Sequence, residues 1–223
     1  MDERRRPLVI AFDVMETLFP IAALEGRFTA AGLAPGTVRH WFERALRNGF
    51  ALSAGGGHRP FGEVAVGALL DVDGHRLSEA AARELVGAVA ELEPRPEAAT
   101  AIRLAREAGP RVVALTNGSA ATTGTLLGRT GLDAHVERVI SADEVGRWKP
   151  APEPYLHAAE VCGVPRARLA LVAAHAWDVD GARRAGLTTG WSAHLEGHFP
   201  AVFERADVHG TDLVDVVEGL LAL

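Results

Sequence analysis

Cysteine is nearly absent from the 223-residue sequence, in which Cys162 is the only one. A single cysteine excludes a disulfide framework within the chain and a zinc site built from several cysteines. Neither is needed for folding, because a chain of this length buries roughly 70% of the surface that its unfolded form exposes. With 48% hydrophobic and 23% charged residues, the composition is typical of a globular protein.

Long apolar runs and a surplus of basic residues are also missing. The basic cluster Arg4 to Arg6 precedes an apolar run that stops at Asp13, too short for a signal-peptide core or a membrane span. The net charge is -6, and the basic residues are scattered among acidic ones, unlike the basic patch of a nucleic-acid-binding protein. We therefore expect a cytoplasmic protein that binds neither membrane nor nucleic acid, and a homodimer stays open.

Lysine is as rare as cysteine. Among 23 lysine and arginine residues, Lys149 is the only lysine. The lysine ammonium is a compact point charge with an adjustable pKa, whereas the arginine guanidinium is wide and always charged. Biased codon usage explains the count equally well, so the count by itself only directs attention to Lys149.

Short apolar runs alternate with helical patterns along much of the chain. The first run, residues 7–13, ends at Asp13. Four more runs lie at residues 111–116, 136–141, 169–174 and 187–191. Continuous apolar runs separated by helices predict an α/β fold with a parallel sheet and crossover helices.

Residues 20–93 differ because they contain only helical patterns. Residues 37–52 and 78–92 each place apolar side chains on one helical face. The glycine-rich residues 53–60 predict a flexible connection between two of these helices. We therefore expect a core of residues 1–19 and 94–223 with an inserted helical cap, residues 20–93.

Ligands of open parallel sheets bind beyond the carboxyl ends of the strands. Asp13 is expected there, in a cleft between core and cap. A carboxylate in that place can attack an electrophile and form a covalent ester. A helix cap or a salt bridge is the alternative for an isolated aspartate.

Four motifs follow one another along the chain. They are Phe12 to Leu18, Leu115 to Ser119, Lys149-Pro150 followed by Tyr155, and Val172 to Asp178. In this order, at predicted strand ends and loops, they resemble the haloacid dehalogenase superfamily over nearly the whole chain. The resemblance implies a Rossmann-like core with a helical cap, and Asp13 as the nucleophile.

Two positions distinguish branches of that superfamily. Most members are magnesium-dependent phosphatases with a second aspartate two residues after the nucleophile and an acidic metal ligand in the fourth motif. Met15 and Ala174 stand at these positions here, so the remaining carboxylates form a poor magnesium cage. The chain is more similar to the metal-independent 2-haloacid dehalogenases, which implies a small anionic 2-substituted carboxylic acid as substrate and no metal or cofactor.

The resemblance also implies roles for the residues around the nucleophile. Lys149 is expected to keep Asp13 and Asp178 ionised, since a point charge fits between two carboxylates. Asp178 is expected to orient or deprotonate the hydrolytic water, and it can also be the N-cap of a helix over residues 179–185. Thr17 and Tyr155 match family positions that bond the nucleophile loop and the active-site network, with a turn hydroxyl and a half-buried aromatic as alternatives.

A second set of residues is expected to contact the substrate. Thr116 and the backbone amides of Asn117 and Gly118 lie between a strand end and a helix start, which favours binding of the substrate carboxylate. His175 replaces an amide common in the branch. It either holds the hydrolytic water or is a hydrogen-bonded core histidine.

The cap departs from the family pattern. Characterised members place an arginine directly after a cap tryptophan to receive the halide, but here Trp41 is followed by Phe42. Trp41 and Phe42 stay candidates for substrate contact, and Arg39 or Arg44 is a candidate replacement for the halide-binding arginine. Glu16 occupies a position where glycine is frequent.

Four functions remain open from the sequence. The leading hypothesis is a metal-independent hydrolase that displaces a halide at C2 of a small acid through an aspartyl ester. The others are the same chemistry with a different leaving group, such as the ring nitrogen of a strained cyclic amino acid, a magnesium-dependent phosphatase, and a catalytically silent anion-binding module. Retention of Asp13, Lys149 and Asp178 together argues against the silent module.

Overall fold

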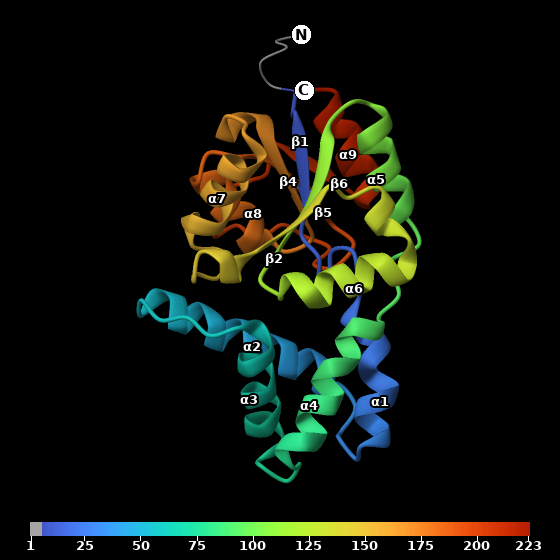
Figure 1. Cartoon of the computed structure of the whole chain (residues 1–223), viewed down its shortest axis with the longest axis vertical. Coiled ribbons are helices and arrows are strands. Elements are labelled where there is room, and N and C mark those ends of the chain that lie inside the picture. Colours follow the sequence, from blue (N-terminus) through green and yellow to red (C-terminus); the bar gives the residue numbers. More distant parts are fainter. Residues whose placement is uncertain (1–5) are drawn as a thin grey trace.

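A parallel six-stranded sheet forms the centre of the computed structural model, which describes residues 6–223 (Figure 1). The strands are β1 Val9–Phe12, β2 Arg111–Thr116, β3 Arg138–Ser141, β4 Leu169–Ala173, β5 Thr188–Ser192 and β6 Val208–Gly210. Their order is β3-β2-β1-β4-β5-β6, so β1 lies between β2 and β4. Arg4 and Arg5 of the basic cluster lie outside the described residues.

The α/β fold is confirmed, and the five predicted strands are present with ends shifted by two residues or fewer. Strand β6 was not predicted. It has three residues, none of them fully buried, and pairs with β5 at the sheet edge. Such a short, half-exposed edge strand has no continuous apolar run to reveal it.

Helices cover both faces of the sheet. Those of the core are α5 Ala98–Glu107, α6 Ala120–Thr130, α7 Pro152–Cys162, α8 Ala176–Arg184 and α9 Leu213–Leu221, with 3-10 helices at Leu132–Ala134, Ala142–Glu144 and Arg166–Arg168. Helices α5 and α9 lie on one face, and α7 and α8 on the other (Figure 1). Buried apolar side chains form two clusters, one on each face of the sheet. Along β1, Ile10 and Phe12 belong to the cluster that includes α5 and α9, while Val9 and Ala11 belong to the cluster that includes α7 and α8. This is the alternation that a strand buried on both faces requires.

Residues 20–93, which we call the cap segment, are helical and lie beyond the carboxyl ends of the strands (Figure 1). The helices are α1 Glu25–Ala30, α2 Thr37–Ala54, α3 Phe61–Asp73 and α4 Glu79–Gly87, with 3-10 helices at Ile21–Leu24 and Ala88–Glu91. The helix expected over residues 78–92 is therefore shorter, since α4 starts after its N-cap Ser78 and ends at Gly87. The segment has its own apolar contacts, including the Phe28 and Trp41 rings at 5.3 Å.

Across residues 6–223, we find no helix with the length and apolar character that crossing a membrane requires.

Candidate active site

Polar side chains from three neighbouring strands meet at one edge of the sheet. Asp13 directly follows β1, Thr116 is the last residue of β2, and Asp178 lies in the first turn of α8, after β4. Lys149 comes from the loop between β3 and α7. These residues are distant in sequence but adjacent in space because parallel strands end at the same edge.

Lys149 joins the two carboxylates. Its Nζ donates to Asp13 Oδ1 at 2.8 Å, to Asp178 Oδ2 at 2.6 Å and to the Leu115 carbonyl oxygen at 2.9 Å. The side chain is fully buried. An ammonium has three hydrogens, so every donor of Lys149 has an acceptor and its position is fixed.

Asp178 is held from its other side by Tyr155. The Tyr155 hydroxyl donates to Asp178 Oδ1 at 2.6 Å, and both side chains are fully buried. The expectation that Asp178 caps a helix over residues 179–185 is wrong. Helix α8 begins at Ala176 with His175 as the N-cap residue, and the carboxylate of Asp178 is already used by Lys149 and Tyr155.

Thr17 fixes the second oxygen of Asp13. Its hydroxyl donates to Asp13 Oδ2 at 2.6 Å and accepts from the Ala174 N–H at 3.0 Å, so it connects the loop after β1 to the end of β4. The chain turns back between Asp13 and Thr17 through Glu16, whose φ of 65° lies in the left-handed region. Glycine reaches this region without strain, which accounts for the frequent glycine at this position.

The charges of the site depend on one another. Burial tends to raise the pKa of Asp13, but Lys149 and His175 outweigh it and hold that pKa well below the ordinary range. For Asp178, burial and the nearby Asp13 charge raise the pKa. Burial disfavours the Lys149 ammonium, yet Asp13 and Asp178 raise its pKa above the usual value. At neutral pH Asp13 is therefore a carboxylate beside an ammonium.

The loop after β2 carries the expected carboxylate-binding groups. The Gly118 N–H donates to Thr116 Oγ1 at 2.9 Å and is therefore already used. The Asn117 side chain is also used, because Oδ1 accepts from the Lys149 N–H at 2.8 Å and Nδ2 donates to the Lys149 carbonyl at 3.2 Å. The Asn117 backbone N–H donates to no acceptor among residues 6–223. This leaves that N–H and the Thr116 hydroxyl hydrogen to meet an anion.

His175 faces Asp13. Its Nδ1 lies 3.9 Å from Asp13 Oδ2, is buried, and has no hydrogen-bond partner among the described residues. The ring packs near Phe42 and Trp177, with centroid distances of 6.3 and 5.2 Å. The alternative of a hydrogen-bonded core histidine therefore does not describe Nδ1.

A small cavity lies against Asp13. Its volume is about 20 Å³. The lining residues are Asp13, Met15, Phe42, Leu46, Phe61, Thr116, Asn117, Gly118, His175 and Trp177. The cap segment contributes only the apolar side chains of Phe42, Leu46 and Phe61.

The structure does not bring Trp41 to this cavity. Trp41 is buried inside the cap segment, where its Nε1 donates to the Ala65 carbonyl at 2.8 Å. Adjacent helix positions point about 100° apart, so Trp41 and Phe42 cannot both face Asp13. Arg39 pairs with Glu43 and its side chain is 86% exposed, and Arg44 does not line the cavity either.

Trp148, which the sequence did not reveal as important, connects the loop that carries Lys149 to the cap segment. Its N–H donates to Ser53 Oγ and its Nε1 to the Arg59 carbonyl, both at 2.9 Å. The indole lies against Gly49 in α2, where a Cβ would come within 2.2 Å of the ring. Residues 53–60 are thus hydrogen-bonded to the core as well as connecting two helices, and no pattern around position 148 signals this contact.

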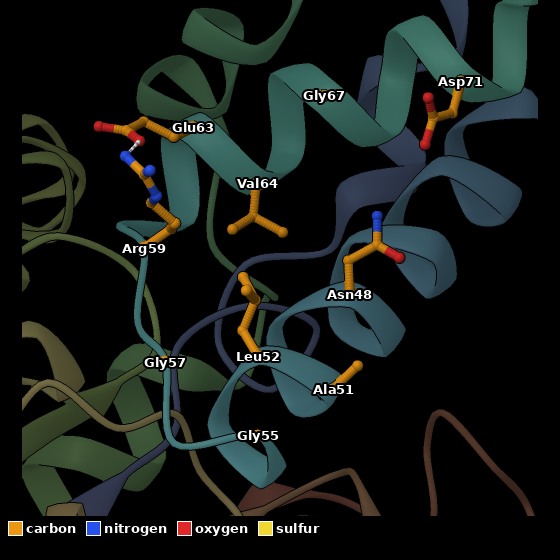
Figure 2. Close-up of a pocket in the computed structure, with 10 residues that line it drawn as sticks. All are labelled: Asn48, Ala51, Leu52, Gly55, Gly57, Arg59, Glu63, Val64, Gly67 and Asp71. Atoms are coloured by element: carbon orange, nitrogen blue, oxygen red, sulfur yellow. Dashed lines mark hydrogen bonds and ion pairs between the residues drawn. The ribbon is translucent and has the colours of Figure 1, made fainter.

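A second hollow lies on the cap segment between α2 and α3 (Figure 2). It has a volume of about 730 Å³. The lining includes Asn48, Val64, Gly67 and the Arg59–Glu63 ion pair, but none of Asp13, Lys149 or Asp178. This hollow is therefore separate from the site at the sheet edge.

Known proteins share the fold of this chain. A family model for haloacid dehalogenase-like hydrolases matches residues 8–186, which is most of the chain. The chain belongs to this family. It is 29% identical over 194 residues to haloacetate dehalogenase H-2 from Moraxella sp. (strain B), covering 82% of this chain and 84% of that protein.

Two further similarities span almost the full length. The (S)-2-haloacid dehalogenase from Pseudomonas sp. (strain YL) is 28% identical over 221 residues, which cover 94% of this chain and 92% of that protein. Among solved structures, the L-2-haloacid dehalogenase RSc1362 has a TM-score of 0.87 at 28% identity, covering 97% of this chain and 99% of that one.

Many haloacid dehalogenase-like hydrolases use magnesium, and the donors present here do not suit it. One oxygen of Asp13 and one of Asp178 face the Lys149 ammonium, which occupies the position between the carboxylates. Ala174 offers no side-chain ligand, and no set of three His, Cys, Asp or Glu side chains in residues 6–223 is arranged to hold a metal ion. Magnesium needs several oxygen ligands in near-octahedral geometry, which this arrangement does not offer.

Proposed function

We propose that this hydrolase acts on small anionic 2-substituted carboxylic acids, foremost 2-haloacids, through an ester on Asp13. The observation that carries the proposal is the Asp13–Lys149–Asp178 arrangement, in which an ammonium keeps the nucleophile ionised. The relatives named as haloacetate and (S)-2-haloacid dehalogenases support the substrate class. In this proposal the core, residues 1–19 and 94–223, supplies the reacting groups, and the cap, residues 20–93, closes the cavity over them.

The first step is an in-line attack of an Asp13 oxygen on C2 of the substrate. The C–O bond forms as the bond from C2 to the leaving group breaks, and a halide departs with the electron pair. Lys149 and Thr17 hold the carboxylate in place. The Thr116 hydroxyl and the Asn117 N–H bind the substrate carboxylate, since they are the donors that the loop leaves available.

The second step is hydrolysis of the ester at Cγ of Asp13. Water attacks this carbon while His175 Nδ1 accepts a proton, the alcohol oxygen of the 2-hydroxy acid leaves, and the proton passes to that product or to solvent. The 20 Å³ cavity has room for a water molecule, which needs about 10–15 Å³. Asp178 is fully buried and does not line this cavity, so in this proposal it positions Lys149 instead of taking the proton.

Halide release from 2-bromopropanoate and 2-chloropropanoate, measured with and without EDTA, tests the proposal. We expect release that EDTA does not reduce and magnesium does not stimulate, because the Lys149 ammonium already neutralises the carboxylates. Loss of turnover in EDTA with rescue by magnesium would overturn the proposed mechanism.

A second candidate keeps the mechanism but changes the leaving group. It is favoured by the lining of the cavity, which contains no arginine or lysine to receive a halide. A strained ring nitrogen bound to C2 of a cyclic amino acid can take a proton as it leaves, and His175 lies in the cavity to supply one. Ring opening measured beside halide release, with the same enzyme preparation, decides between the two leaving groups.

A further inference from the structure

The cavity against Asp13 is too small for a whole substrate, but a larger cavity adjoins it. The adjoining cavity has a volume of about 410 Å³ and shares Met15, Phe61, Thr116 and Gly118 with the small one. We call it the Val86 cavity. It extends from the nucleophile loop to the space between α3, α4 and the start of α6.

The lining of the Val86 cavity is largely apolar. Its apolar side chains include Val66 on α3, Val86 on α4 and Leu126 on α6. Two charged side chains also line it, Arg83 and Glu63. Each is more than half exposed and is paired with a side chain of opposite charge. A ligand of this shape and polarity is a hydrocarbon chain, since apolar pockets of several hundred Å³ bind apolar groups through burial of surface.

A third cavity adjoins the small one on its other side, past Phe42 and Trp177. It is lined by apolar side chains and by charged side chains of both signs, which include the carboxylates of Glu16, Glu43 and Glu196 and the guanidinium groups of Arg39 and Arg47. An apolar chain placed there would remove water from these carboxylates without replacing their hydrogen bonds. The Val86 cavity is therefore the better place for an apolar group.

Attack at C2 limits where a substituent can point. The substrate carboxylate takes the Thr116 and Asn117 donors, and the leaving group lies opposite the attacking Asp13 oxygen. Two positions on C2 remain, one for the hydrogen and one for the alkyl substituent, and the enantiomer that binds decides which is which. We place the substituent toward the wall formed by Met15 and Phe61, which the small cavity and the Val86 cavity share. Met15 is unbranched and adapts its shape, so this wall can part around a chain.

We propose that the Val86 cavity binds an alkyl chain on C2, so that the enzyme prefers 2-substituted acids with chains of several carbons over haloacetate. This inference rests on the proposed function. Each methylene group removed from water favours binding roughly fourfold. Kinetics with 2-bromoacetate, 2-bromopropanoate, 2-bromobutanoate and 2-bromohexanoate test it.

Three exposed glycines allow matched variants. Gly62 and Gly87 line the Val86 cavity, whereas Gly67, on the same helix as Gly62, lines the hollow of Figure 2. A Cβ at any of the three meets no atom within 4 Å, and all three lie in helices, where replacing glycine favours the folded state. Gly62→Phe and Gly87→Phe reduce the cavity, and Gly67→Phe is the control.

The readout is kcat/KM for 2-bromohexanoate divided by that for 2-bromoacetate. We expect this ratio to exceed about 10 in the unaltered enzyme, to fall at least about tenfold in Gly62→Phe and Gly87→Phe, and to stay constant in Gly67→Phe. A ratio below one in the unaltered enzyme, or an equal ratio in all three variants, would overturn the inference. Bromoacetate turnover alone would then still support the proposed function, while no turnover of any bromoacid would count against both.

Discussion

The two walls of the active site have opposite chemistry. On the core wall, Asp13, Thr17, Lys149 and Asp178 are buried and hydrogen-bonded to one another. On the cap wall, Phe42, Leu46 and Phe61 line the cavity with no charged group. The proposed nucleophile and its counter-charge thus come from the core alone. The apolar cap wall is expected to exclude water, which strengthens the electrostatic interactions inside.

The largest effect is expected from Lys149→Arg, which tests whether the core wall needs a compact cation. A guanidinium keeps the charge but does not fit where Nζ lies 2.8 Å from Asp13 and 2.6 Å from Asp178. We expect a loss of about 10² to 10³-fold in kcat, the scale for a positioned electrostatic group. Halide-release kinetics measure this loss, and circular dichroism checks that the variant is folded. A near-normal kcat would show that the site does not require a compact cation at position 149.

The same position gives a pH signature. Lys149 is the largest influence that lowers the pKa of Asp13, and burial opposes it. In Lys149→Gln the ammonium that lowers the pKa of Asp13 is gone, while burial still raises it. The pKa of Asp13 therefore rises, and the carboxylate is protonated at a higher pH. Because only the ionised form attacks, we expect the acid limb of residual halide release to shift to higher pH than in the unaltered enzyme.

His175 offers the next test of the core wall. In His175→Phe the proton acceptor beside Asp13 is lost, while the aromatic packing against Phe42 and Trp177 is kept. We expect ester hydrolysis to slow by about 10²-fold, with the first step affected less. Mass spectrometry of the quenched enzyme should then show an accumulated ester on the peptide that contains Asp13, and the absence of any such ester in the slowed variant would remove His175 from the second step.

Where the two walls meet, a pair of glycine variants in the cap segment separates packing from helix propensity. Gly49→Ala would place a Cβ within 2.2 Å of the Trp148 ring, so we expect it to lower the free energy of unfolding by about 1–3 kcal/mol. Gly67→Ala meets open space and should raise it by about 0.5–1 kcal/mol. Urea titrations of both variants measure the free energy of unfolding. An equal change in both variants would mean that the contact of Trp148 with Gly49 does not stabilise the cap segment.

The smallest expected effect concerns the leaving group at the cap wall. Without an arginine in the cavity, chloride should leave more slowly than bromide, because it needs more stabilisation as it gains charge. Phe42 lines the cavity, so Phe42→Arg should raise the ratio of chloride to bromide release by a few fold. Ion chromatography of both halides measures this ratio. Equal release by the unaltered enzyme would show that the cap wall is not what limits chloride.

The fold and the core wall were predictable because both follow local rules. Apolar runs marked five strands, and Asp13 and Asp178 follow strands that lie side by side, so their meeting at one edge could be inferred. The true start of α8 was missed, since its N-cap residue, His175, is not among the residue types that usually cap helices. The prediction that Asp178 caps a helix failed for that reason.

The cap wall was less predictable because long-range packing determines it. Trp41 and Phe42 are adjacent and both apolar, and only the arrangement of α1, α2 and α3 decides which one faces Asp13. The contact between Gly49 and Trp148 joins residues nearly a hundred positions apart with no shared pattern. Such contacts depend on how whole helices dock, and periodicity within one segment does not contain that information.

The most direct test of the ester on Asp13 is a single turnover in heavy-oxygen water, with enzyme in excess over 2-bromopropanoate. Water attacks Cγ of Asp13 in the second step, so its oxygen should appear in the Asp13 side chain and not in the 2-hydroxy acid. Mass spectrometry of the peptide containing Asp13 and of the product reads both positions. Label found only in the product would mean that water attacks C2 directly, which would contradict Asp13 as the nucleophile.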